Sequence, residues 1–198
     1  MHITKIISIF LILSSLLNLY LTYIVVNYQQ YDAWYTKHRI VIPLCDEVDY
    51  VYHWLNDTII YLEKGKLTEA VFLLGRSYEG FYIIAYHSGD LAYKYPELSN
   101  TLFNLKSYSK HLAQTIIRIS AYLSSENTSR EVLTEWLGEL INALFDLYNS
   151  LYYHLWLEGE HREKFLEKHQ NYTINTIDES VNKLQEIIKA APLHSLNK

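Results

Sequence analysis

Residues 98–123 read LSNTLFNLKSYSKHLAQTIIRISAYL and contain the most regular apolar pattern of the chain. Apolar or small side chains recur there at alternating intervals of four and three residues, at Leu98, Leu102, Leu105, Ser109, Leu112, Ile116, Ile119 and Leu123. This spacing places all of them along one side of an α-helix. The pattern predicts a helix that starts at Pro96 and buries a narrow seam against other helices.

The segments on both sides of this stretch have the same helical periodicity. The predicted helices cover residues 44–62, 68–89, 130–155 and 176–190, and Gly65 and Gly89 are expected to end the first two. No segment alternates with a period of two, so no strand is expected. Short turns between amphipathic helices make neighbours antiparallel. We therefore predict an all-α, antiparallel up-down helical bundle over residues 44–198.

Residues 6–26, IISIFLILSSLLNLYLTYIVV, contain no charged side chain. As a helix they would be about 31 Å long, which matches the hydrocarbon thickness of a bilayer. The run is longer than the apolar part of a secretory signal peptide, and no small residues follow it to form a cleavage site. We therefore predict that residues 1–26 are a transmembrane signal-anchor that the mature protein keeps.

The helix of this anchor is expected to continue into the rest of the chain. Apolar and aromatic positions at Ile24, Tyr28, Tyr31, Tyr35, His38 and Ile42 keep the spacing of four and three residues until Pro43, which is expected to end the helix. Residues 27–43 are thus predicted to be a helical stalk. A belt of aromatic side chains is predicted at the membrane interface: Tyr20, Tyr23, Tyr28, Tyr31, Trp34 and Tyr35.

The protein is predicted to be single-pass, with its C-terminal domain on the extracytoplasmic side. A short N-terminal segment before a long domain favours this orientation, although the basic residues on the two sides of the span are nearly balanced. Residues 137–157 are the other apolar stretch of similar length. They contain Glu139 and Asp146, and each acid would cost about 2.5–3.5 kcal/mol at a bilayer centre. A bundle helix explains this stretch better.

Charge and cysteine content limit the function classes. Lys5 is the only charged residue before position 27, which leaves 16 basic and 22 acidic residues in the remainder of the chain. This balance gives no basic surface for nucleic acid. Cys45 is the only cysteine, so no disulfide can form within the chain, and we expect an inert thiol near a helix start.

The residues that could carry chemistry form no convincing catalytic set. Glu158 and His161 have the spacing of a di-iron Glu-x-x-His pair, but the chain has no second pair of this kind. The chain has nine histidines, and six of them are expected on different helices with no His-x3-His pair: His53, His87, His111, His154, His161 and His169. Nucleophile and phosphate-loop motifs are absent from the sequence. We expect a protein that is not an enzyme and holds no metal or cofactor.

Two predicted helices are apolar over more of their surface than one seam requires. The first face comprises Phe72, Arg76, Glu79, Ile83 and Tyr86, where Arg76 and Glu79 are spaced for pairing and Gly75 and Gly80 would admit a neighbouring helix. The second comprises Phe145, Tyr148, Tyr152 and Trp156. Such faces occur on central helices with several neighbours, and they also occur at partner-binding surfaces.

Three functions remain open on these grounds. The leading hypothesis is a non-enzymatic, membrane-anchored interaction or accessory protein that binds a protein partner or self-associates through the two faces. The alternative is an extracytoplasmic ligand-sensing bundle that signals through a partner protein. The third is a metal-dependent enzyme that uses Glu158 and His161.

Overall fold

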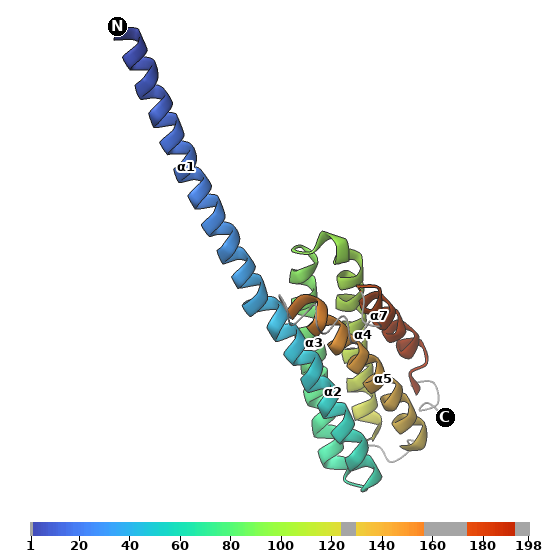
Figure 1. The fold of residues 1–198 in the computed structure, drawn as a ribbon. Helices are drawn as coiled ribbons and strands as arrows, with labels where there is room; N and C mark the ends of the chain where they lie inside the picture. Colours follow the sequence, from blue (N-terminus) through green and yellow to red (C-terminus); the bar gives the residue numbers. More distant parts are fainter. Residues whose placement is uncertain (1, 124–129, 157–173, 193–198) are drawn as a thin grey trace.

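The computed structural model describes residues 2–123, 130–156 and 174–192, without the side chains of residues 2–10, 12 and 174. The described part is helical apart from short turns and contains no strand. Its helices pack into a bundle from which the N-terminal helix projects as a free rod (Figure 1). The prediction of an all-α bundle is confirmed.

The free N-terminal rod and the first helix of the bundle form one continuous helical element. It consists of α1 (His2–Thr36), the π-helical turn η1 (Lys37–Val41) and α2 (Ile42–Glu63). The prediction that Pro43 ends the stalk is wrong, because Pro43 lies in the first turn of α2 and the helix passes through it. Proline cannot donate a backbone hydrogen bond. The wider turn before it, closed by the Ile42 N–H on the Lys37 carbonyl, keeps the chain helical at this point.

Gly65 ends α2 as predicted. Its φ of 71° lies in the left-handed region that suits glycine, and the Lys66 N–H donates to the Tyr61 carbonyl at 2.8 Å. The chain then reverses into α3 (Leu67–Ala92). The prediction that Gly89 ends this helix is wrong. Gly89 is buried inside α3, where a Cβ would lie 2.9 Å from Nζ of Lys106 on the next helix, so its small size permits packing.

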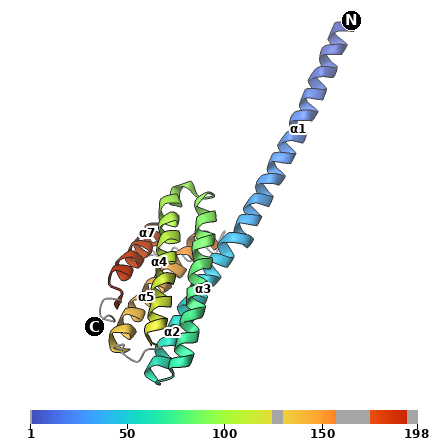
Figure 2. The ribbon, with the colours of Figure 1, turned by 180° about the vertical axis from the view of Figure 1, so that it is seen from behind.

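The remaining elements complete the up-down order. They are the short η2 (Pro96–Leu98), α4 (Ser99–Leu123), α5 (Arg130–Leu151), the π-helical η3 (Tyr152–Trp156) and α7 (Ile174–Lys189). Successive long helices run in opposite directions (Figures 1 and 2). Helix α3 packs between α2 and α4, and α2 also packs against α5. Helix α7 packs against both α4 and α5.

The predicted seams form the core. Every position of the 98–123 stripe is buried, as are the leucines of α5 from Leu133 to Leu151. Polar contacts fix α7 at the edge: Trp136 Nε1 donates to the Ile187 carbonyl at 2.8 Å, and Thr101 Oγ1 donates to Asp178 Oδ1 at 2.9 Å. Cys45 is fully buried, and burial raises the pKa of its thiol, so it belongs to the core.

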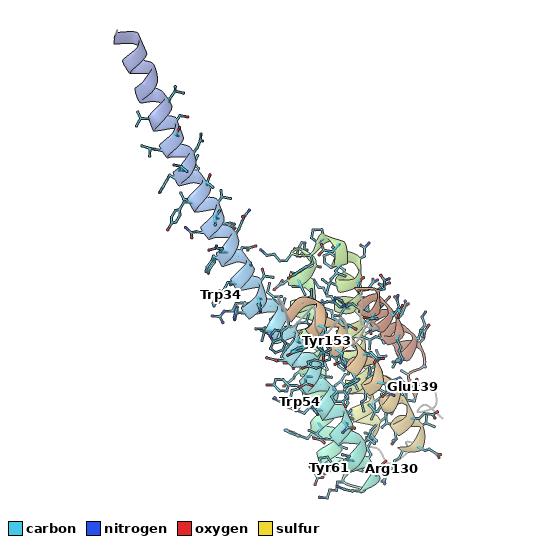
Figure 3. All side chains as sticks on the ribbon, in the orientation of Figure 1. Trp34, Trp54, Tyr61, Arg130, Glu139 and Tyr153 are labelled. Atoms are coloured by element: carbon cyan, nitrogen blue, oxygen red, sulfur yellow. The ribbon has the colours of Figure 1, made fainter. Side chains whose placement is uncertain are left out.

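The rod beyond the bundle is exposed on all sides. The large apolar side chains described in α1 are 43–69% exposed, and they point outward around the helix (Figure 3). An ion pair connects α1 to the bundle, because Nζ of Lys94, just beyond α3, donates to Asp32 Oδ1 at 2.6 Å.

Within the part of the chain whose side chains are described, no helix combines the length and apolar character needed to cross a membrane. The predicted span over residues 6–26 includes residues 6–10 and 12, whose side chains lie outside that part.

Candidate interaction surface

The first predicted face lies on the outer side of α3 and is exposed throughout. We call Phe72, Arg76, Glu79, Ile83 and Tyr86 the α3 face. Phe72 and Tyr86 are each 66% exposed, and Ile83 is 41% exposed. Neighbouring helices α2 and α4 cover the other sides of α3. An exposed apolar row of this kind is typical of an interaction surface.

Arg76 and Glu79 stand at the centre of the α3 face. Arg76 Nη1 donates to Glu79 Oε2 at 3.4 Å, and both side chains are about half exposed. The Arg76 guanidinium also lies 4.9 Å from the ring centroid of Trp54 on α2, which is a cation–π distance. Such an exposed ion pair contributes little stability, so these charges can exchange partners at small cost.

A hollow of about 400 Å³ lies between α2 and α3 beside this pair. Its walls are Glu47, Tyr50 and Trp54 of α2 and Arg76, Glu79 and Ile83 of α3. Burial raises the pKa of the Glu47 carboxyl, and the nearby Arg76 charge opposes that rise. The hollow therefore combines aromatic walls with a half-buried carboxyl whose pKa is raised by burial.

The α2 wall of this hollow was not predicted from the sequence. Glu47, Tyr50 and Trp54 are spaced three and four residues apart, beside the buried stripe that contains Val48, Val51 and Leu55. A search for a second stripe on the predicted helix over 44–62 would have found them. Nothing in the sequence alone indicates that this stripe lies next to Arg76.

Gly80 and Gly75 differ in what surrounds them. A Cβ built on Gly80 would collide with Val51 Cγ2 and lie 2.8 Å from Glu47 Oε1, so α2 packs closely against α3 at this point. No heavy atom lies within 4 Å of the corresponding position at Gly75. The expected close approach of a helix is found at Gly80, where the approaching helix is α2 of the same bundle. At Gly75 no helix approaches among the described residues.

The second predicted face, on α5 and η3, has a different environment. We call Phe145, Tyr148, Tyr152 and Trp156 the α5 row. Phe145 is 46% exposed and lies 5.7 Å from the Tyr52 ring of α2, while Tyr148 and Trp156 pack against the core. Along the row, Tyr152 lies 5.7 Å from Tyr148 and 4.8 Å from Trp156.

The environment of Tyr148 follows from this packing. Burial, then the Asp49 carboxylate, then the neighbouring Tyr152, raises the pKa of Tyr148 to about 12. Asp49 lies on α2, which contacts α5, and η1 contacts η3. Tyr148 and Trp156 of the α5 row therefore pack against the core where α2 and η1 lie beside α5 and η3, while Phe145 stays exposed.

The remaining candidate residues do not gather into a site among the described residues. Tyr31 and Trp34 stack on α1 with ring centroids 6.3 Å apart, and all six predicted interface aromatics are exposed on the rod. No three metal-ligating side chains come together in the described ranges, and Glu158 and His161 lie outside them. His87 is partly buried, and this burial lowers its pKa.

Comparisons with family models, with curated proteins and with solved structures give no match to this chain.

Proposed function

We propose that this protein is a non-enzymatic, membrane-anchored helical bundle that binds a protein partner, or a second copy of itself, through the α3 face. The observation that carries the proposal is the exposed row of Phe72, Ile83 and Tyr86 around the Arg76–Glu79 pair. Exposed aromatic and aliphatic residues next to an exchangeable ion pair match the composition of protein interfaces.

The anchor is supported by the surface of the rod. Residues 6–26 contain no charge, and the large apolar side chains described in α1 are all exposed. Leaving this much apolar surface in water is unfavourable, at roughly 25 cal/mol per Å². A lipid bilayer would cover it, and the predicted interface aromatics would then lie at the bilayer surface. The bundle would stand on the extracytoplasmic side.

The anchor is tested with the full chain and with a chain lacking residues 1–26, both expressed in cells. The full chain should stay with the membrane fraction after an alkaline carbonate wash, and the shortened chain should be released. A full chain that washes off would contradict the anchor without affecting the bundle.

The interaction surface is tested by extracting the full chain in mild detergent and measuring its assembly mass by native mass spectrometry. We expect an assembly larger than one chain, and Ile83→Asp should reduce it to a single chain with unchanged helicity. The matched control is Ile117→Asp on α4, because Ile117 is 45% exposed, close to Ile83, but lies outside the α3 face. Equal loss in both variants would contradict a specific surface.

A second candidate function is ligand sensing, and the hollow beside Arg76 favours it. A space of about 400 Å³ with two aromatic side chains and a half-buried carboxyl in its walls has the size of a small-molecule site. A small added mass on a single chain in the same spectra, lost in Trp54→Ala, would favour this function over the first.

A further inference from the structure

The α3 face has the spacing of a helix–helix seam. Its five positions are separated by four, three, four and three residues, a repeat of 3.5 that is characteristic of coiled coils. The buried side of the same helix uses other residues, among them Leu74, Phe81 and Ile84. In the described part of the chain, α3 therefore carries a second stripe whose five side chains are all exposed, with α2 touching one edge of it through Trp54 and Arg76.

The charges of this seam are complementary to those of an antiparallel copy. When residue 77 of one chain lies level with residue 78 of the other, Arg76 faces Glu79 of the second copy, and the two-fold axis repeats this pair. Phe72 then faces Ile83 of the second copy, also twice. A parallel pair would instead place Arg76 against Arg76 and Glu79 against Glu79, which is unfavourable. Opposite charges therefore select the antiparallel arrangement.

The outer layer of the same register is also complementary. Glu69 is exposed on α3, and it would face Tyr86 of the second copy. The Tyr86 hydroxyl would then donate a hydrogen bond to the Glu69 carboxylate, and charge-assisted bonds of this kind are stronger than neutral ones. One register thus gives opposite charges at the centre, apolar contacts beside them and hydrogen bonds at both ends.

The shape of the surface fits the same register. Phe72 protrudes, being 66% exposed, while Ile83 lines the hollow between α2 and α3. Because Phe72 of the second copy lies level with Ile83, it stands at the mouth of this hollow, beside the Tyr50 and Trp54 rings. Aromatic rings in such a position pack favourably. The open space around Gly75 leaves room for the approaching helix.

We propose that the occupant of the α3 face is a second copy of this chain, bound antiparallel with Arg76 opposite Glu79 and Phe72 opposite Ile83. This inference rests on the proposed function, because it names the partner of the same surface. In the antiparallel arrangement the helices of the second copy run opposite to those of the first. Because α1 leaves each bundle at one end, the two rods would point in opposite directions (Figures 1 and 2). With both rods anchored, the two copies would join two facing membranes.

The register is tested by disulfide formation in the full chain. Phe72→Cys and Ile83→Cys variants, each with a different tag, are mixed and oxidised. A mixed disulfide should form between the two variants. Each variant alone should give none, because its two cysteines would lie 11 residues, roughly 16 Å, apart along the seam. The wild-type chain is the control, since its single Cys45 is fully buried.

The charge pair is tested in the same preparation by measuring the dimer dissociation constant. Arg76→Glu places two carboxylates in each central pair, and Glu79→Arg places two guanidinium groups there. Either change should weaken the dimer about tenfold or more. The double variant Arg76→Glu with Glu79→Arg should restore wild-type affinity. Circular dichroism checks that each variant stays folded.

The outcomes separate this inference from the proposed function. A disulfide of Phe72→Cys with itself, or no recovery in the double charge variant, would overturn the antiparallel register. A different chain held on the α3 face, and lost in Ile83→Asp, would overturn self-association while leaving the proposed function standing. A strictly single chain in native extracts, with nothing bound, would overturn both.

Discussion

The α3 face and the α5 row both place large apolar or aromatic side chains beside a buried seam, but they differ in how many of these side chains pack against the core. Phe72 and Tyr86 of the α3 face project from the protein, whereas Tyr148 and Trp156 of the α5 row pack against the core. The cause is the position of α2. It contacts α5 over the surface that holds the row, and it meets α3 at Gly80, to one side of the α3 face. A wide apolar arc therefore indicates an extra neighbour, and the fold decides whether that neighbour belongs to the same chain.

The largest expected effect comes from truncating one tyrosine in each region. Tyr148→Ala should lower the free energy of unfolding by about 2–3 kcal/mol, because it removes an aromatic ring that packs against the core. Tyr86→Ala, on the α3 face, should change it by less than about 0.5 kcal/mol. Chemical denaturation of both variants measures the difference. Equal effects would contradict the distinction between a covered and an open face.

Replacing two glycines of α3 by alanine should change the stability of the fold by smaller amounts, in opposite directions at Gly80 and Gly75. Gly80→Ala should destabilise the fold by about 1–2 kcal/mol, because a methyl group there meets Val51 and Glu47 of α2. Gly75→Ala should stabilise it by about 0.5–1 kcal/mol, since the site is open and alanine favours the helix. Thermal unfolding of the pair checks which side of α3 the bundle covers. A loss of stability at Gly75 would show that this side is covered as well.

The effect confined to the narrowest range of conditions is a dependence on alkaline pH that belongs to the α5 row. The fold raises the pKa of Tyr148 from its usual value near 10 to about 12, so the folded protein holds the phenol proton more tightly than the unfolded chain. The resulting stability is complete below pH 10 and is lost as the pH rises toward 12. Tyr148→Phe should flatten the fall of unfolding temperature over this range.

The control for this titration is Phe72→Leu on the α3 face, which removes an exposed ring but no ionisable group, measured in the same buffers. Its profile should follow that of the wild-type chain between pH 10 and 12. A wild-type slope that persists in Tyr148→Phe would assign the effect to other groups.

Helix periodicity predicted the core of this protein well, because a seam with a 3.5-residue repeat is a local property. Leu102, Leu112 and Ile119 are buried as expected, and Gly65 ends α2 with the backbone angle that glycine allows. Two local predictions failed for reasons that lie elsewhere in the chain. Gly89 is held inside α3 by packing against Lys106, and Pro43 is accommodated by the π-helical turn before it.

Of the two helices that form the candidate site, only the residues on α3 were predicted from the sequence. The α3 face followed from its own helix, since its residues share one stripe. The α2 wall with Glu47, Tyr50 and Trp54 was missed, because the hollow exists only where α2 lies beside α3. Burial is the largest cause of the raised pKa of the Glu47 carboxyl, and this carboxyl lies against Gly80 of α3.

By itself, the sequence determined the helices, the buried stripes and the uncharged segment over residues 6–26. These features depend on interactions within one helix or on the periodicity of one stripe. Only the tertiary structure decided that Tyr148 and Trp156 of the α5 row pack against the core while the α3 face stays exposed. Which helix lies against which depends on the packing of the whole bundle, and residues such as Tyr86 and Tyr148 carry no local signal that distinguishes them.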